Sequence, residues 1–438
     1  MRRRKSQKFT GSTVTIASLV FLGQLVFLTG CTSPEPEPTE ELSDVTVYEG
    51  ARVIVGDGSN PIENATFIVE DTRLIQVGPS NDISVPEGAK HVDLTGHTVI
   101  PALIDTHVHL RRTRDELIDD LQHKAYYGVG VVMSLGQDSG DMFFEIRDAV
   151  LANTARYRTA GRGITRPEPG RSEIPYWINT PDMARQAVQE LAILEVDLVK
   201  IWVDDRNGQY DKLTPELYEA VIDEAHQHGL RVTAHIFSLD DAKGLLRAGV
   251  DAFAHGIRDM EIDEEGVTLF QEHPDVVLVP NLPNRGVEED LSWLSNTIPP
   301  AELDELQARA TNNMDAQAAF AIQAHNLATL NSAGVKIAFG TDGNSAWAPH
   351  VEMADMVASG MTPHEVIVAA TRTSADLLGL NNVGTLAPGK SADFVVLDAN
   401  PLDDITNTRH ISGVYLRGEA VDRRSLSANW IGGNAQQP

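Results

Sequence analysis

Short apolar runs alternate with longer amphipathic stretches through the middle of the chain. The runs lie near residues 99–107, 129–135, 157–163, 198–203, 231–235, 251–255, 276–281 and 336–341. Helix starts are expected at three Thr-Pro pairs, because threonine can cap a helix and proline fits its first turn; the pairs are Thr180-Pro181, Thr214-Pro215 and Thr362-Pro363. Alternating strands and helices are typical of parallel βα units, and eight strands are the number that closes a barrel. The pattern therefore predicts an α/β protein with a (β/α)8 TIM barrel over residues 101–382.

Both flanks of this block follow a different pattern. Residues 45–100 and 383–423 alternate short strand-like runs with turns rich in Gly, Asp, Asn and Pro, which indicates a small β unit. Because the two flanks enclose the barrel, we expect them to form one composite β-sandwich domain, followed by a tail over 424–438. Residues 384–391 match a phosphate-loop pattern, but a strand and not a helix is expected to follow, so we interpret them as a turn.

The beginning of the chain has the pattern of an export signal. A basic start, Arg2 to Lys8, precedes an apolar stretch, Val14 to Leu28, and then Leu-Thr-Gly-Cys31. The last four residues resemble the lipobox of bacterial lipoproteins, which implies cleavage before Cys31 and a lipid on its thiol. We therefore expect a signal peptide over 1–30, an acidic tether over 31–44, and an exported protein anchored to a bacterial membrane on its periplasmic or cell-surface side. An ordinary signal peptide or a single membrane span are the alternatives.

Composition narrows the choice of partners. The 438 residues include 42% hydrophobic positions, enough for a large core, and the formal net charge is −28. So acidic a chain repels nucleic acid, which argues against nucleic-acid binding. The single cysteine excludes intrachain disulfides. The oligomeric state stays open.

Candidate metal ligands end four of the predicted strands. They are His107 and His109 on the first, His235 and His255 on the fifth and sixth, and Asp342 after the eighth. His107 and His109 are two residues apart on a strand, so their side chains share a face. Each ligand alone could be a polar strand end, a core histidine or a turn aspartate. Because the carboxyl ends of parallel strands meet at one end of a barrel, the five together indicate a metal site.

Lys200 lies inside the apolar run Leu-Val-Lys-Ile-Trp202. Burying an ammonium is costly unless it is paired or chemically changed. One interpretation is an ion pair with Asp204 or another acid. The other is addition of CO2 to the neutral amine, which makes a carbamate that can bridge two metal ions.

These residues together resemble the amidohydrolase superfamily. The resemblance includes the start Ile104-Asp-Thr-His-Val-His109, the strand-end histidines, the Gly-Thr-Asp342 end, and the tail from Val383 to Asp398. Within the superfamily the chain is most similar to the imidazolonepropionase-like and Xaa-Pro dipeptidase-like branch. The resemblance implies two divalent metal ions, zinc first, with manganese, iron or cobalt as alternatives. One ion would be held by His107, His109 and Asp342, the other by His235 and His255, with carboxylated Lys200 as the bridge.

The implied activity is hydrolysis of an amide C–N bond by a metal-bridging hydroxide, with Asp342 carrying a proton to the leaving group. The expected substrate is a small molecule or short peptide, namely a dipeptide or an N-acyl amino acid. A cyclic amidase or a lactone or ester hydrolase is an alternative on the same site, and a surface binding lipoprotein on an inactive barrel is an alternative of another class. Candidates for contact with substrate or oxyanion are His350, Arg258, Tyr126, Tyr127 and Trp202.

Overall fold

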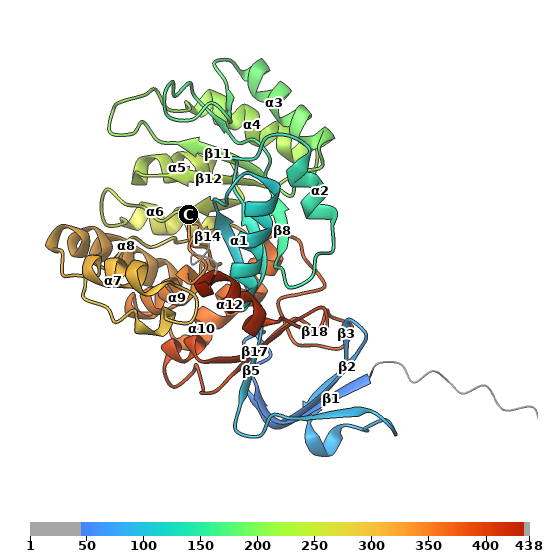
Figure 1. Cartoon of the computed structure of the whole chain (residues 1–438). Coiled ribbons are helices and arrows are strands. Elements are labelled where there is room, and N and C mark those ends of the chain that lie inside the picture. Colours follow the sequence, from blue (N-terminus) through green and yellow to red (C-terminus); the bar gives the residue numbers. More distant parts are fainter. Residues whose placement is uncertain (1–44, 433–438) are drawn as a thin grey trace, which may run out of the picture. The chain divides into compact units, whose positions relative to one another are not determined.

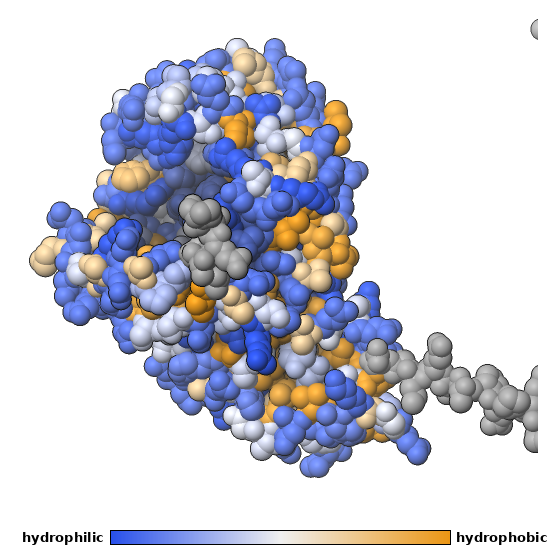
Figure 2. Space-filling model, viewed as in Figure 1, coloured by the Kyte–Doolittle hydropathy of each residue, from blue (hydrophilic) through white to orange (hydrophobic). Residues whose placement is uncertain are grey.

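The computed structural model describes residues 45–432 of the chain (Figure 1). The predicted signal peptide and tether, with Cys31, and the end of the predicted 424–438 tail lie outside the described residues. Over 45–432, none of the helices combines the length and the apolar character that a membrane crossing requires. The face drawn in Figure 2 is largely hydrophilic and is hollowed near its centre.

Both flanks contribute strands to one sheet, as the composite domain requires. The sheet runs in the order β18-β17-β16-β5-β1-β2-β3, and β4 also pairs with β1. The strands are β1 (Val45–Val53), β2 (Ile62–Glu70), β3 (Arg73–Pro79), β4 (Lys90–Asp93), β5 (Thr98–Pro101), β16 (Phe394–Leu397), β17 (Ile411–Leu416) and β18 (Glu419–Ala420). The two flanks meet where β16 pairs antiparallel with β5, opposing Val395 and Ile100. Residues 384–391 form a turn ahead of β16, so the phosphate-loop pattern lacks the helix that it needs.

The middle of the chain forms the TIM barrel. Its strands are β6 (Leu103–Val108), β7 (Val129–Ser134), β8 (Arg156–Thr159), β9 (Ile164–Thr165), β11 (Val199–Val203), β12 (Val232–Ile236), β13 (Ala252–Ala254), β14 (Val277–Val279) and β15 (Lys336–Ile337), with β10 (Tyr176–Trp177) added beside β9. All their pairings are parallel. They form two sheets, β6-β7-β8 and β10-β9-β11-β12-β13-β14-β15. The first and last barrel strands approach each other where the Thr106 amide donates to Phe339 O (2.9 Å). The third predicted strand is split into β8 and β9, in keeping with its weakly apolar sequence.

Helices lie between the barrel strands and after the last of them, and one more follows the last strand of the flanking sheet. They are α1 (Arg114–Tyr126), α2 (Met142–Asp148), α3 (Pro181–Ile193), α4 (Pro215–Gln227), α5 (Leu239–Arg247), α6 (Glu264–Glu272), α7 (Pro300–Arg309), α8 (Met314–Ser332), α9 (Ala348–Ala358), α10 (Pro363–Val368), α11 (Ser374–Leu377) and α12 (Arg423–Gly432). The three Thr-Pro pairs begin α3, α4 and α10, as predicted. Polar residues that directly follow the barrel strands therefore gather at one end of the barrel.

Candidate active site

The five candidate ligands all lie at the carboxyl ends of barrel strands. His107 belongs to β6 and His109 follows it, His235 belongs to β12, and His255 and Asp342 follow β13 and β15. Asp342 adopts a left-handed backbone conformation, with φ of 53°. Its amide donates to His107 O (2.8 Å), which fixes the eighth strand end against the first.

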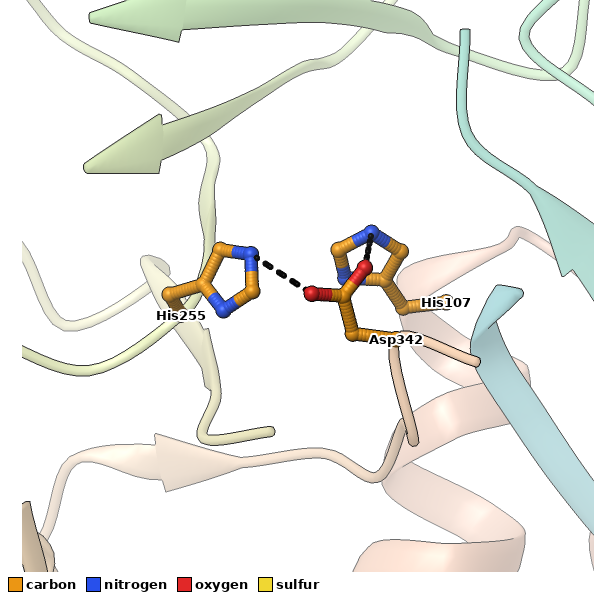
Figure 3. Close-up of side chains that lie close together, drawn as sticks. All are labelled: His107, His255 and Asp342. Carbon is orange, nitrogen blue, oxygen red and sulfur yellow. Dashed lines mark ion pairs between the residues drawn. The ribbon is translucent and has the colours of Figure 1, made fainter. Parts of the chain in front are cut away.

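The Asp342 carboxylate is the centre of this cluster. Its Oδ1 lies 3.0 Å from His107 Nε2 and 3.1 Å from His109 Nε2, and its Oδ2 lies 3.4 Å from His255 Nε2. Figure 3 shows His107 and His255 on opposite sides of this carboxylate, each with a ring nitrogen directed toward it. The ligand atoms of His107, His255 and Asp342 all lie within 4.8 Å of one another, a spacing that can hold one metal ion.

Burial decides the charge states in the cluster. Burial lowers the pKa of His107 to about 3, so its imidazole is neutral and can bind a metal at ordinary pH. Burial would raise the pKa of Asp342, but the facing histidines outweigh it and hold that pKa well below its usual range. The side chains of Asp342 and His109 are 36% and 32% exposed, which leaves the cluster open to solvent on their side.

Asn281 contacts the cluster and was missed by the sequence analysis. Its Nδ2 lies 2.9 Å from His107 Nδ1, while its own buried Oδ1 has no hydrogen-bond partner among the described residues. With the amide turned over, Oδ1 would accept from the Nδ1–H of His107 and leave the Nε2 lone pair free for a metal. The signal that could have found Asn281 is its place at the end of the seventh predicted strand.

Lys200 is fully buried in β11, and its Nζ has no hydrogen-bond partner among the residues described. Burial lowers the pKa of this amine to about 7. The interpretation that Asp204 pairs with Lys200 is wrong: the Asp204 carboxylate lies 2.5 Å from Arg206 Nη1 and 2.9 Å from His235 Nε2. The ammonium nitrogen instead lies 5.5 Å from the centre of the Trp202 ring. Trp202 therefore lies beside Lys200, and its contact with substrate stays a prediction. The carbamate interpretation of Lys200 has no competing ion pair with Asp204.

His235 adjoins the cluster, but its Nε2 is occupied by other side chains. The His235 and His255 ring centres are 4.5 Å apart. Besides Asp204, the Nε2 of His235 contacts Arg206 Nη1 at 2.9 Å and Arg258 Nη2 at 3.2 Å. The structure thus brings Arg258 to the site, together with Arg206 and Asp204, which the sequence analysis did not place there.

Buried imidazole nitrogens, a low-pKa carboxylate and an unpartnered lysine amine fit divalent metal ions. His107, His255 and Asp342 have the spacing for an ion, and His109 contacts the same carboxylate oxygen as His107. The division into two ions with Lys200 as the bridge remains a prediction.

Three candidates for substrate contact lie in a different cluster. His350 Nε2 contacts Tyr127 O (3.0 Å) and its Nδ1 contacts Thr408 Oγ1 (3.1 Å). Tyr127 pairs through its hydroxyl with Thr297, and Tyr126 lies under Arg423. Tyr126 and Tyr127 end α1 just ahead of β7, so they approach the amino end of the barrel strands, opposite the ligands. The structure does not support a catalytic place for His350, Tyr126 or Tyr127, which pack the barrel against the β domain.

The ligand cluster at the strand ends agrees with the comparison to known families. Residues 176–421 match the model of the amidohydrolase family, a range that includes Lys200, His235, His255 and Asp342. The chain belongs to the amidohydrolase family. This amidohydrolase is an enzyme that hydrolyses carbon–nitrogen bonds.

Individual relatives agree with this placement. The chain is 26% identical over 358 residues to imidazolonepropionase of Streptomyces griseus, covering 77% of this chain and 86% of that one. A candidate prolidase of Bifidobacterium longum is 28% identical with a TM-score of 0.71, covering 88% and 98% of the two chains. The structure of an Xaa-Pro dipeptidase with bound methionine is 23% identical with a TM-score of 0.70, covering 86% and 99%. At 23% identity, the likeness to this dipeptidase shows a shared fold and no more.

Proposed function

We propose that this amidohydrolase cleaves the amide bond of a dipeptide or an N-acyl amino acid with the help of two divalent metal ions. The observation that carries the proposal is the Asp342 carboxylate, which faces the Nε2 atoms of His107, His109 and His255 at 3.0–3.4 Å. The substrate class is supported by two of the similar structures, a candidate prolidase and an Xaa-Pro dipeptidase that holds methionine in its active site.

The chain's own residues supply binding and proton transfer. Metal ions held by the histidines and Lys200 would lower the pKa of water and polarise the scissile carbonyl. The Asp342 carboxylate is ionised and lies at the centre of the cluster, so it is placed to accept a proton from the attacking water. The water oxygen bonds to the carbonyl carbon, Asp342 returns the proton to the leaving nitrogen, and the C–N bond breaks. The products are a carboxylic acid and an amine.

A metal and substrate screen tests this function. The purified protein is stripped with chelator, reloaded with zinc, manganese or cobalt, and assayed on a panel of dipeptides and N-acyl amino acids. We expect close to two equivalents of metal and turnover of at least one substrate group. Asp342→Asn should lose most turnover, whereas Asp275→Asn, which changes an exposed acid paired with Lys336, should not.

Three outcomes would contradict the proposal. Less than one equivalent of metal would favour the inactive binding barrel. Turnover confined to cyclic amides, lactones or esters would show that dipeptides and N-acyl amino acids are not the substrates. Full activity of Asp342→Asn would exclude Asp342 as the group that transfers the proton.

We also propose that the protein is exported and anchored through a lipid on Cys31. The proposal is supported by the basic start, the apolar stretch and the Leu-Thr-Gly-Cys31 sequence that follows it. In a bacterial host, the full-length protein should fractionate with membranes, and Cys31→Ser should release it or leave it unprocessed. Identical fractionation and processing of the two forms would refute the lipid anchor.

A further inference from the structure

Arg258 lies beside the candidate metal ligands on the segment that follows β13. Its backbone amide donates to Phe237 O (2.9 Å), which ties this segment to the end of β12. Its Nη2 donates to Ile236 O (2.7 Å) and lies 3.2 Å from His235 Nε2. These contacts hold the guanidinium at the edge of the cluster, in a fixed direction.

Arg258 has no direct ion pair among the described residues, although Asp204 and Asp342 act on its charge from farther away. Within residues 45–432, no carboxylate oxygen lies within 4.0 Å of its guanidinium nitrogens, and its buried Nε has no hydrogen-bond partner. The neighbouring Arg206 differs, because it contacts both Asp204 (2.5 Å) and Glu168 (3.3 Å). Because no carboxylate in this part of the chain touches the guanidinium of Arg258, the site has room for an anion in direct contact that arrives with the substrate.

We propose that Arg258 binds the α-carboxylate of the substrate's amino-acid half and so sets the position of the scissile amide. This inference rests on the proposed function. A guanidinium can bind a carboxylate through two parallel hydrogen bonds, a geometry that suits the fixed side chain of Arg258. The substrate class is thereby narrowed to amides whose leaving amine is an α-amino acid with a free carboxylate.

The spacing in the site suits such a substrate. In an N-acyl amino acid, three bonds separate the acyl carbon from the carboxyl carbon, a span of no more than about 4 Å. From Arg258 to His235 is 3.2 Å, the His235 and His255 rings are 4.5 Å apart, and His255 is 3.4 Å from Asp342. His235 and His255 thus link Arg258 to the Asp342 cluster, so a carboxylate on Arg258 would lie at the edge of that cluster.

Arg258 could instead stabilise the oxyanion, the role that the sequence first suggested. The two roles differ in what they depend on. An oxyanion forms from every amide substrate, so the loss of a side chain that stabilises the oxyanion lowers the rate for all substrates. A carboxylate contact exists only for substrates that carry the carboxylate.

The test compares each acid with its carboxamide. Substrates are N-acetyl-L-methionine, N-acetyl-L-phenylalanine and N-acetyl-L-alanine, each paired with the matching C-terminal carboxamide. For the metal-loaded wild type we expect kcat/KM to favour the acid at least tenfold. Arg258→Met should lose about 10- to 100-fold on the acid, mainly through KM, and little on the carboxamide, so that the preference disappears. Arg258→Lys should recover part of the preference, because it restores the charge without the two-pronged geometry.

Arg423→Met is the matched control. Arg423 is also largely buried, hydrogen-bonds two backbone carbonyls and has no carboxylate partner among the described residues, but it lies against Tyr126 and Ile411. Its substitution should leave the acid-over-carboxamide preference unchanged. An equal loss on acid and carboxamide in Arg258→Met, or an unchanged preference, would overturn the carboxylate assignment.

A binding measurement separates this inference from the proposed function. If metal-loaded protein hydrolyses none of the panel, the proposed function fails, and calorimetry with L-methionine and L-methioninamide still examines Arg258. We expect the wild type to bind L-methionine more tightly than the amide, and Arg258→Met to weaken binding of the acid alone, at least tenfold. Equal binding of L-methionine by wild type and variant would overturn the inference by itself.

Discussion

Lys124→Met should weaken the fold and the site together, because Lys124 neutralises the acid that precedes the first histidine ligand. Lys124 Nζ, on α1, lies 2.9 Å from Asp105 Oδ2, and both side chains are fully buried. Asp105 also accepts from the amide (3.1 Å) and the hydroxyl (2.8 Å) of Thr341, the residue before Asp342. The pair therefore joins the first helix to the strand end that presents the central carboxylate.

The magnitude follows from what the substitution leaves behind. Removing one partner of a buried ion pair costs roughly 3–5 kcal/mol, because the remaining charge is buried without compensation. Asp105 would keep the two donors from Thr341 and a longer contact from the His107 amide (3.3 Å), so we expect the lower end, about 3 kcal/mol. Methionine fills nearly the same volume as lysine, so no large cavity term is added.

Urea unfolding followed by circular dichroism measures this loss, and steady-state assays measure the accompanying fall in kcat. The double variant Asp105→Asn with Lys124→Met removes both charges and should recover most of the stability. A loss below about 1 kcal/mol in Lys124→Met would refute the reasoning. So would a double variant as unstable as the single one.

Other variants address separate parts of the site and fold. Lys200→Ala should reduce bound metal from two equivalents to one, measured by elemental analysis, and abolish most turnover; full activity would exclude a bridging role. Burial lowers the pKa of His350 to about 3, so the folded state resists protonation: stability is complete above pH 6.5 and falls toward pH 3, by about 2–3 kcal/mol at pH 4.5. Urea unfolding at several pH values should show this fall, and His350→Gln should make it shallower without removing it, because the pKa of His107 is also lowered to about 3. In Gly163→Ala the new Cβ would meet Trp202 Cζ3 at 2.1 Å, so thermal unfolding should show a loss of about 1–3 kcal/mol with altered tryptophan fluorescence.

The barrel and its ligands were accessible from sequence because both are local patterns. A buried parallel strand appears as an apolar run, and the residue after it must lie at the carboxyl end of the barrel. That rule alone places His107, His235, His255 and Asp342 at one end. The rule weakens where a strand is short or polar, and the third strand is accordingly split between β8 and β9.

Contacts among side chains from different loops were not accessible in this way. Lys200 and Asp204 are four residues apart, so strand alternation favours one face for both. Asp204, however, lies beyond the end of β11, and its carboxylate turns to Arg206 and His235 instead. The choice among candidate substrate residues failed for a similar reason. Tyr126 and Tyr127 were candidates because they are aromatic and lie near a strand. They come before β7, however, so they lie at the amino end of the strands, opposite the ligands. Residue type alone does not reveal which end of the barrel a side chain approaches.

Burial is what turns these residue types into a reactive set. On the surface, a histidine is half protonated near pH 6.5 and a lysine is charged at every physiological pH, so neither would be a ready ligand or nucleophile. In the barrel, burial lowers the pKa of His107 to about 3 and that of Lys200 to about 7, so at neutral pH the imidazole of His107 is neutral and about half of the Lys200 amine is. Asp342 remains ionised beside them because the imidazoles face it. The apolar strands that reveal the fold in the sequence therefore also set the protonation states on which the chemistry depends.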